Sequence, residues 1–370
     1  MKEREIITVI AGNLARSPRQ RNTTFASDAE ILELNGCRLA VTVDDYSSED
    51  RLADRDPALL GWNLVAATVS DLLAVGAQPR FMLNSLVATV QMDAAYLAAL
   101  ATGMQQALAV CGAHMAGGDI GSGAEWRFTG VALGSFQAGQ VPLCRLAPRG
   151  SGAVMVTGAF GEANLAAAAG AGNGQLAALA GPPPRFAIRL AESAALAALV
   201  PECAGGAAAD DTAEIRAAAC IDTSDGLVAA LETLCTLDAG LRIEIDTASV
   251  PLAPGVAAAA SAMGVPPEVF LMGSAGEYEL LALVPEPAVD VIARAGLRQI
   301  GVFATGPRPE PSRSGLGRPG PSRPGLHFRR NAELIAHPGL PDPRDAASFD
   351  AYCATLIQLA RSVFGGQGRP

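Results

Sequence analysis

Six aspartates stand singly where strands or helices are expected to end, and their type and spacing suggest chemistry on phosphate. They are Asp28, Asp44, Asp71, Asp119, Asp222 and Asp225. Mg²⁺ takes oxygen ligands and shares phosphate oxygens. Asp119 also follows two glycines and precedes two more, and glycine lets backbone N–H groups approach a phosphate closely. The pattern therefore predicts a site for a polyphosphate with Mg²⁺.

Each of these aspartates also has a purely structural interpretation. Asp44 and Asp45 could form a turn, Asp225 could cap the following helix, and the glycines around Asp119 could form a plain turn. The sequence contains no GxxxxGK[ST] phosphate loop and no GxGxxG after a first strand. None of its three histidines stands in a recognisable catalytic triad.

The aspartate with the clearest need for a positive partner is Asp71, because it lies in an apolar helix. Asp56 is expected to cap this helix, and Gly76 to end it. A helix that is apolar around its circumference is buried, and a buried carboxylate requires an ion pair or a metal. The partner could be a ligand cation, or an arginine such as Arg80 or Arg127.

Alternating strands and helices predict an α/β or α+β chain in two domains. We expect a first domain over 1–148, a second over 149–305, a flexible Pro/Gly/Arg-rich linker over 306–326 and a C-terminal extension with a helix over 327–370. Expected details are a loop over 117–123 and a helix that starts at the prolines of 182–184.

The composition excludes several classes of function. Of the 370 residues, 17% are charged and the net charge is −10, whereas a nucleic-acid binder is basic. The longest apolar runs are too short to span a membrane, and the N-terminus lacks the features of a signal peptide. The seven scattered cysteines favour neither zinc nor disulfides. We therefore expect a cytoplasmic protein without nucleic-acid or membrane partners.

Seven motifs occur in an order that resembles a known family. They are Asp28, the strand into TVDD, SDLLAVGAQP (70–79), GGD (117–119), VTGAFGEA, IDTSDGL (221–227) and the YELL strand. The chain resembles the thiamine-monophosphate kinase branch of the aminoimidazole-ribonucleotide-synthetase (AIR synthase-related) superfamily. The resemblance covers roughly residues 25–305.

This resemblance implies a fold, cofactors and partners. The N-terminal domain would form a barrel-like sheet across a homodimer, beside a C-terminal α/β layer domain. The ligands would be ATP with Mg²⁺ and a small-molecule acceptor, thiamine monophosphate or a different metabolite. The reaction would be transfer of the γ-phosphate by positioning and charge neutralisation.

The resemblance also assigns residues by position. The implied metal ligands are Asp28, Asp44, Asp71, Asp119 and Asp225. The implied nucleotide-binding residues are Thr42, Gly117, Gly118, Asp119 and Ser224. Asp71 and Asp225 would be catalytic. The implied acceptor-binding residues are Asp45, Tyr46, Glu277 and Tyr278.

The chain departs from the family pattern mainly where the acceptor should bind. Ala26 to Ala29 lacks one carboxylate of the family motif, and Tyr46 to Arg51 lacks its histidine. Ser274 to Leu280 replaces a Gly-Gly-Glu-Asp-Tyr-Glu-Leu motif. Three functions therefore stay open: a kinase, a ligase-type or cyclase-type relative that releases ADP and phosphate, and a non-catalytic nucleotide-binding paralogue.

Overall fold

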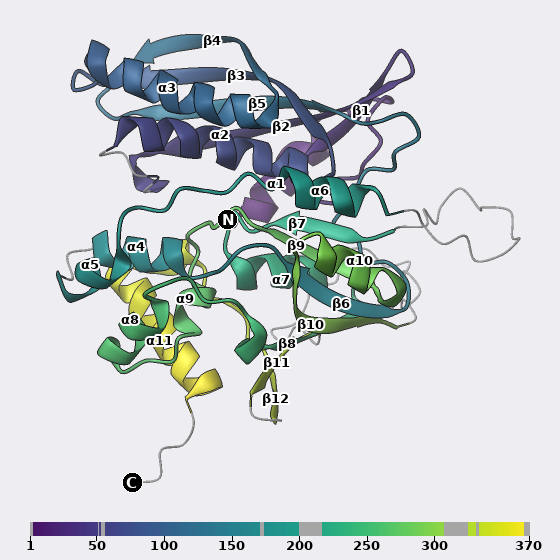
Figure 1. The fold of residues 1–370 in the computed structure, drawn as a ribbon, viewed down its shortest axis with the longest axis vertical. Helices are drawn as coiled ribbons and strands as arrows, with labels where there is room; N and C mark the ends of the chain where they lie inside the picture. Colours follow the sequence, from purple (N-terminus) through teal and green to yellow (C-terminus); the bar gives the residue numbers. More distant parts are fainter. Residues whose placement is uncertain are drawn as a thin grey trace, which may run out of the picture.

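The computed structural model describes residues 3–50, 52, 56–170, 174–199, 217–306, 325–330 and 333–365, and the chain folds into two halves around two sheets (Figure 1). The first sheet has five strands in the order β1-β2-β5-β3-β4. The second has seven strands in the order β12-β11-β8-β10-β6-β9-β7. The expected mixed α/β architecture in two parts is therefore confirmed.

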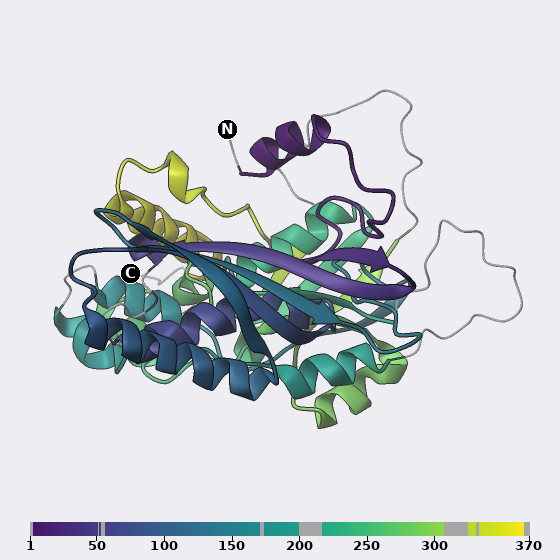
Figure 2. The ribbon, with the colours of Figure 1, turned by 90° about the horizontal axis from the view of Figure 1, so that it is seen from above.

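The described residues of the first half form the five-stranded sheet and the α-helices α1, α2 and α3. Its elements are α1 (Glu3–Gly12), β1 (Glu30–Leu34), β2 (Cys37–Ser47), α2 (Pro57–Ala74), β3 (Gln78–Ala88), α3 (Ala94–Cys111), β4 (His114–Ser122) and β5 (Arg127–Ser135). Seen from above, α2 and α3 run along one side of the sheet (Figure 2). We call the opposite side the outer face. Within the single chain the sheet is open, with β1 and β4 at its edges.

Helix α2 forms as its sequence predicts. The Asp56 carboxylate accepts hydrogen bonds from the amides of Ala58 and Leu59, and Gly76 takes a φ of 73° after the helix ends. Close packing against α3 depends on glycine, because a Cβ on Gly61 would lie 2.0 Å from the Leu100 carbonyl oxygen. The helix that carries Asp71 is therefore fixed in place by its caps and by its neighbour.

The prediction of a loop over 117–123 is wrong, because Gly117, Gly118 and Asp119 lie within strand β4. This strand pairs in parallel with β3, and Asp119 stands opposite Ser85. A Cβ on Gly118 would lie 2.5 Å from the Asn84 carbonyl oxygen. The glycines therefore permit close approach of two strands. A glycine-rich strand of this kind and a glycine-rich turn look the same in the local sequence.

The second half places helices on both sides of the seven-stranded sheet. Its elements are β6 (Ser151–Val156), α4 (Glu162–Gly170), α5 (Gly174–Ala180), α6 (Leu190–Ala197), β7 (Ala219–Asp222), α7 (Leu227–Leu237), β8 (Leu241–Asp246), α8 (Val256–Met263), α9 (Val269–Met272), β9 (Leu280–Pro285), α10 (Val289–Arg294), β10 (Arg298–Thr305), β11 (Leu326–Arg330), β12 (Glu333–Ala336) and α11 (Phe349–Phe364).

The segment expected to be a C-terminal extension is part of this second half. Strand β11 pairs in parallel with β8, and α11 buries Tyr352, Leu356 and Phe364 in the apolar core that β8 and α7 share. Most of the expected linker, residues 307–324, lies outside the described residues.

Residues 183–189, which we call the strap, connect the two halves. Helix α6 begins at Leu190 and not at the prolines, so that prediction is wrong. The Asn63 side chain donates to the Pro184 carbonyl (2.9 Å) and accepts from the Phe186 amide (3.1 Å), and Trp62 donates to the Phe186 carbonyl (2.8 Å). These contacts with α2 hold the strap extended, which local helix signals could not reveal.

Within the part of the chain that the structure describes, two helices, α2 and α3, are long and apolar enough to cross a membrane by length and composition alone. In the structure both pack against each other, and 72% of the apolar window of α2 is buried. The apolar residues of α2 thus lie mainly in the core of the first half, whereas 33% of the apolar window of α3 is buried.

Candidate active site

A cleft of about 820 Å³ opens between the two halves. Its walls come from β2 and α2 of the first half, and from α4, α9, α11 and the segment after β7 of the second half. The strap contributes Pro184 and Phe186. Clefts between domains of this size are the usual sites for small molecules.

Three carboxylates converge at the wall where the two halves meet. Asp28 precedes β1, Asp71 lies in the last turns of α2, and Asp222 ends β7, yet one oxygen from each lies within 4.8 Å of the other two. The Asp28 side chain has no exposed surface, and Asp222 is 3% exposed. Residues almost 200 positions apart in the sequence thus form one cluster.

Hydrogen bonds orient these carboxylates but leave one carboxylate oxygen without a partner. Thr42 donates to Asp71 (2.5 Å), and Ser70 and Ser224 both donate to Asp222. Arg145 forms an ion pair with one oxygen of Asp28 (2.8 Å). The other oxygen, Asp28 Oδ2, is buried and has no hydrogen-bond partner. An orphaned carboxylate oxygen in such a cluster indicates a missing cation.

Asp44 extends the cluster along β2, and burial changes the acidity of the whole group. Burial, together with repulsion from Asp222, raises the pKa of Asp44 to about 7. Burial and the charge of Asp28 raise the pKa of Asp222 to about 6, and burial followed by the charge of Asp44 raises the pKa of Asp71 well above its ordinary value. Arg145 alone therefore does not compensate this group of like charges.

The donor set fits Mg²⁺. All ligand atoms are carboxylate oxygens, which a hard cation prefers, and the cleft leaves room for waters and phosphate oxygens. Of the residues expected to bind metal, the structure brings together Asp28, Asp44 and Asp71. Asp225 lines the same cleft and is exposed.

Three aromatic side chains close the cleft beside the carboxylates. Phe186 of the strap lies against Tyr278, with ring centroids 4.5 Å apart, and Tyr46 is 5% exposed. Burial raises the pKa of both tyrosine hydroxyls well above the ordinary value, so both stay neutral. Tyr278 also has a φ of 53°, a strained conformation of the kind found at functional sites.

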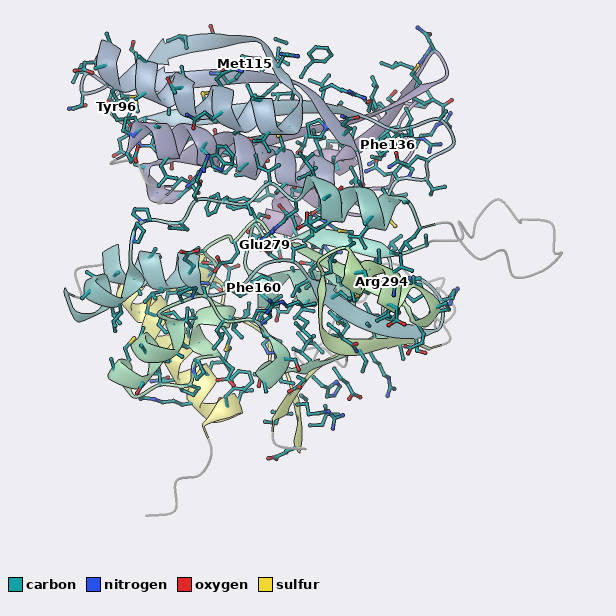
Figure 3. The ribbon with its side chains drawn as sticks, viewed as in Figure 1. Tyr96, Met115, Phe136, Phe160, Glu279 and Arg294 are labelled. Carbon is teal, nitrogen blue, oxygen red and sulfur yellow. The ribbon has the colours of Figure 1, made fainter. Side chains whose placement is uncertain are left out.

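The glutamates on either side of Tyr278 turn away from the cleft. Glu277 accepts hydrogen bonds from the amides of Gly161 (2.7 Å) and Ala163 (3.2 Å) at the start of α4. Glu279 lies between the two halves (Figure 3), where it pairs with Arg189 and accepts from Thr157. Of the expected acceptor-binding residues, Asp45, Tyr46 and Tyr278 line the cleft, whereas Glu277 instead anchors a helix.

The remaining predicted residues lie on the first sheet away from the cluster. Asp45 lines the cleft but pairs with Arg127 (2.9 Å) and Thr129 (2.7 Å). Through the register of β2, β5, β3 and β4, Asp45, Thr129, Ser85 and Asp119 form one row on the outer face. Within one chain the sheet separates Asp119 from the carboxylate cluster.

Sequence reasoning missed two members of the site and left one undecided. Arg145, the counter-ion of Asp28, stands in the turn-rich join between the domains, and Ser70 appeared only as the first residue of the SDLLAVGAQP motif. Asp222 was a candidate, but nothing local separated it from a turn residue. The sequence of α2 contains no lysine or arginine that could pair with Asp71. This was the one feature of the sequence that indicated a cation from elsewhere.

Comparisons with known proteins agree with the architecture of this site. The AIR synthase related protein, N-terminal domain family matches residues 26–136. The thiamine-monophosphate kinase of Methanopyrus kandleri is 32% identical over 257 residues, which cover 69% of this chain and 74% of that protein.

Solved structures share the fold at lower identity. A structure described as AaThiL complexed with AMPPCP and TMP has a TM-score of 0.67 at 20% identity and covers 84% of this chain and 97% of its own. The hydrogenase maturation protein HypE from E. coli has a TM-score of 0.62 at 16% identity, covering 93% and 99%. Sequence and fold together place the chain in the thiamine-monophosphate kinase family of AIR synthase-related proteins.

Proposed function

We propose that this chain is an ATP-dependent kinase that uses Mg²⁺ and transfers the γ-phosphate of ATP to a small-molecule acceptor, with thiamine monophosphate as the first candidate. The observation that carries the proposal is the cluster of Asp28, Asp71 and Asp222, within 4.8 Å of one another and short of positive charge. A polyphosphate could not bind beside three bare carboxylates unless cations came with it.

The residues that would hold Mg²⁺ are Asp28, Asp44, Asp71 and Asp222, with Asp225 at the rim. Magnesium, when bound, neutralises charge on the phosphate oxygens. Thr42, Ser70 and Ser224 fix the orientation of the carboxylates through the hydrogen bonds described above. Arg145 holds Asp28 in position.

The protein part of the reaction would be positioning. Phosphoryl transfer needs the attacking and leaving oxygens in line and requires no covalent intermediate with the protein. Tyr46 and Tyr278, both neutral, and Phe186 form the aromatic wall beside the carboxylates and would limit access of water. Asp225, exposed in the cleft, would contact the acceptor or its ions.

A second copy of the chain fits the outer face of the first sheet, and we propose a homodimer. Val43, Phe81 and Leu83 project from this face with 64%, 51% and 38% of their surface exposed. A contiguous apolar sheet face of this kind is typical of a protein interface. Asp119 lies on the same face. If Asp119, Gly117 and Gly118 bind nucleotide, they would therefore do so at the active site of the second copy. The enzyme would act in the cytoplasm, where ATP and Mg²⁺ are available.

Product analysis of the wild-type protein tests the proposal. The protein is incubated with Mg-ATP and thiamine monophosphate, and ADP, free phosphate and the phosphorylated acceptor are measured. A kinase yields equal amounts of ADP and phosphorylated acceptor. ADP with free phosphate and an unphosphorylated product would instead indicate ligase-type chemistry. Binding of Mg-ATP without turnover across a panel of acceptors would show a non-catalytic nucleotide-binding protein.

A further inference from the structure

Helix α1 is amphipathic, yet its apolar side chains are exposed. Ile6 and Ile10 form the centre of an apolar stripe, because residues four apart share one side of a helix, and Ile7 and Val9 flank them. The exposed fractions of Ile10 and of Leu14, just after the helix, are 55% and 66%. The other three are between 38% and 53% exposed. We call these five residues the α1 stripe.

Helix α1 touches the rest of its chain through its polar side. The Arg4 guanidinium lies over the ring of Phe25, 4.8 Å from the ring centroid. Thr8 stands one turn further along on the same side of the helix, and its hydroxyl donates to the Arg4 carbonyl (2.7 Å). A surface helix normally turns its apolar side toward the core and its polar side toward water. The orientation of α1 in the single chain is therefore the reverse of the usual one.

A helix as short as α1 needs a surface to pack against. It has 10 residues, and isolated helices shorter than about 12–15 residues are only marginally stable in water. In proteins the stability of such a helix comes mainly from the packing of its apolar side. Within the part of the chain that the structure describes, the α1 stripe is left exposed. The surface that it covers must therefore belong to another molecule.

The connection after α1 fixes the helix beside the outer face of the first sheet. Residues 19–21 pair with strand β1: the Arg21 amide donates to the Ile31 carbonyl (2.8 Å), and the Glu33 amide donates to the Arg19 carbonyl (2.9 Å). Helix α1 lies on the side of the sheet opposite to α2 and α3, which is the side of the outer face (Figure 2). The α1 stripe and the apolar outer face are thus neighbours on one side of the molecule.

The outer face offers an apolar surface of the kind that the α1 stripe requires. Two rows of uncharged side chains cross β2, β5 and β3 on this face, and they are Val43, Val131 and Leu83 in one row and Val41, Leu133 and Phe81 in the other. In a two-fold dimer each surface of one copy meets the other copy by the same contact. When the outer faces of two chains meet, α1 of each chain therefore lies next to the outer face of the other.

We propose that the α1 stripe packs against the outer face of a second copy, so that each chain of the homodimer is held by the first helix of the other. The inference rests on the homodimer proposed above. A lipid surface fits less well, because membrane-surface helices carry mainly Lys and Arg on their polar side, whereas α1 has Glu5 beside Arg4. Ile10 is then an interface residue, and Thr8 is not.

A charge placed on the α1 stripe tests this assignment. We expect Ile10→Glu to raise the dissociation constant of the dimer about tenfold or more, because the interface would then bury an unpaired carboxylate. Thr8→Glu puts the same charge on the other side of the same helix, and its dissociation constant should stay within about twofold of wild type. Sedimentation equilibrium of the full chain measures both. Denaturation of the monomers at high dilution checks that the substitutions leave the fold of the single chain intact.

Photo-cross-linking tests where the α1 stripe lies. The photoreactive residue p-benzoylphenylalanine replaces Ile10 in one preparation and Thr8 in another, and each is allowed to exchange subunits with an excess of isotope-labelled wild type. After illumination, position 10 should yield peptides that join unlabelled α1 to labelled β2, β3 or β5, and position 8 should not. Cross-links from position 10 to unlabelled peptides of its own chain alone would contradict the proposal.

The remaining outcomes separate this inference from the proposals on which it depends. If the wild-type chain is monomeric at every concentration, the homodimer fails and the inference fails with it. If it dimerises and Ile10→Glu dissociates no more readily than wild type, the homodimer stands and the role of α1 is wrong. The role is also wrong if wild type sediments with vesicles of phosphatidylcholine and phosphatidylglycerol and only this binding is lost in Ile10→Glu. Failure of the chain to bind Mg-ATP would overturn the kinase and leave the contact of α1 standing.

Discussion

Two groups of buried carboxylates differ in whether their oxygens have partners, and this difference separates a functional group from a structural one. Asp28, Asp71 and Asp222 form the cluster of the cleft, where Asp28 keeps an oxygen without a partner. Glu277 and Glu279, on either side of Tyr278, are about as buried, yet backbone amides engage the first and Arg189 the second. Burial alone therefore does not show which carboxylates are functional. The two groups are distinguished by the hydrogen-bond and ion-pair partners of each carboxylate.

The difference has an energetic consequence. A carboxylate group that lacks compensating charge destabilises the folded protein until a cation binds, and such a penalty is found at functional sites. Removal of the arginine partner from a buried glutamate such as Glu279 destabilises the protein, because a charge is then stranded in the core. Substitutions that remove the charge of Asp71 or the partner of Glu279 should thus have opposite effects on stability.

The largest effect is expected for Asp71→Asn. We expect a loss of Mg-dependent ATP turnover of about a thousandfold or more, because a metal ligand close to the phosphates is removed. In the absence of Mg²⁺ the same variant should be more stable than wild type, since Thr42 can still donate to the amide oxygen and one buried charge is gone. Turnover assays and chemical denaturation in EDTA measure the two effects.

Asp45→Asn is the matched control for this variant, because Arg127 and Thr129 already satisfy Asp45. Its loss of turnover should be about tenfold or less. An Asp71→Asn variant that retains turnover, or that is less stable than wild type in EDTA, would contradict the assignment of the cluster to metal binding.

Arg189→Leu should produce the opposite signature in the second group. It strands Glu279, which is 6% exposed, and we expect the free energy of unfolding to fall by about 3 kcal/mol. The double variant Arg189→Leu, Glu279→Gln should recover part of this loss, because the stranded charge is removed. Denaturant titration of Arg189→Leu, Glu279→Gln and the double variant measures the coupling. Simple additivity of the two single substitutions would show that the ion pair has no structural role.

Asp119 belongs to neither group, and a mixing experiment decides where it acts. Asp71→Asn and Asp119→Asn are expected to be nearly inactive alone. If Asp119 serves the site of a second copy, equal mixing followed by subunit exchange should restore about a quarter of wild-type activity, since half of the dimers then contain one intact site. If Asp119 acts within its own chain, no mixed dimer contains an intact site and activity stays absent.

The smallest effect is expected for Glu277→Gln, and it depends on pH. Burial raises the pKa of Glu277 from 4.5 to about 8, so the folded state holds a proton that the unfolded state releases between these pH values. The free energy of unfolding contributed by this group therefore falls as the pH rises, by at most about 1.4 kcal/mol per pH unit.

The glutamine side chain introduced by this substitution cannot titrate, while its amide oxygen can still accept from Gly161. The stability of Glu277→Gln should thus decline less steeply than that of wild type between about pH 5 and pH 8. Denaturation in EDTA across this range measures the slopes. Parallel slopes for the two proteins would show that Glu277 does not take up a proton on folding.

Much of the local structure could be predicted because the signals lie close together in the chain. Asp56 and Gly76 delimit α2, and the apolar residues between them predict its burial. The alternation of β2 predicts that Asp44 and Asp45 face opposite sides, but not which side meets α2. The charge of Asp71 in an apolar helix indicated a need for a cation before any fold was known.

The tertiary structure alone decided which distant residues meet. Asp28 and Asp222 reach Asp71 because β7 of the second half packs against α2, and Arg145 joins them from the connection between the halves. Long-range packing also explains why the GGD segment is an edge strand and not a loop, and why the strap is not helical. The sequence determines periodicity, caps and the presence of uncompensated charge, because these depend on neighbours in the chain. Partners of a buried charge depend on contacts across about two hundred residues, and only the packed fold defines them.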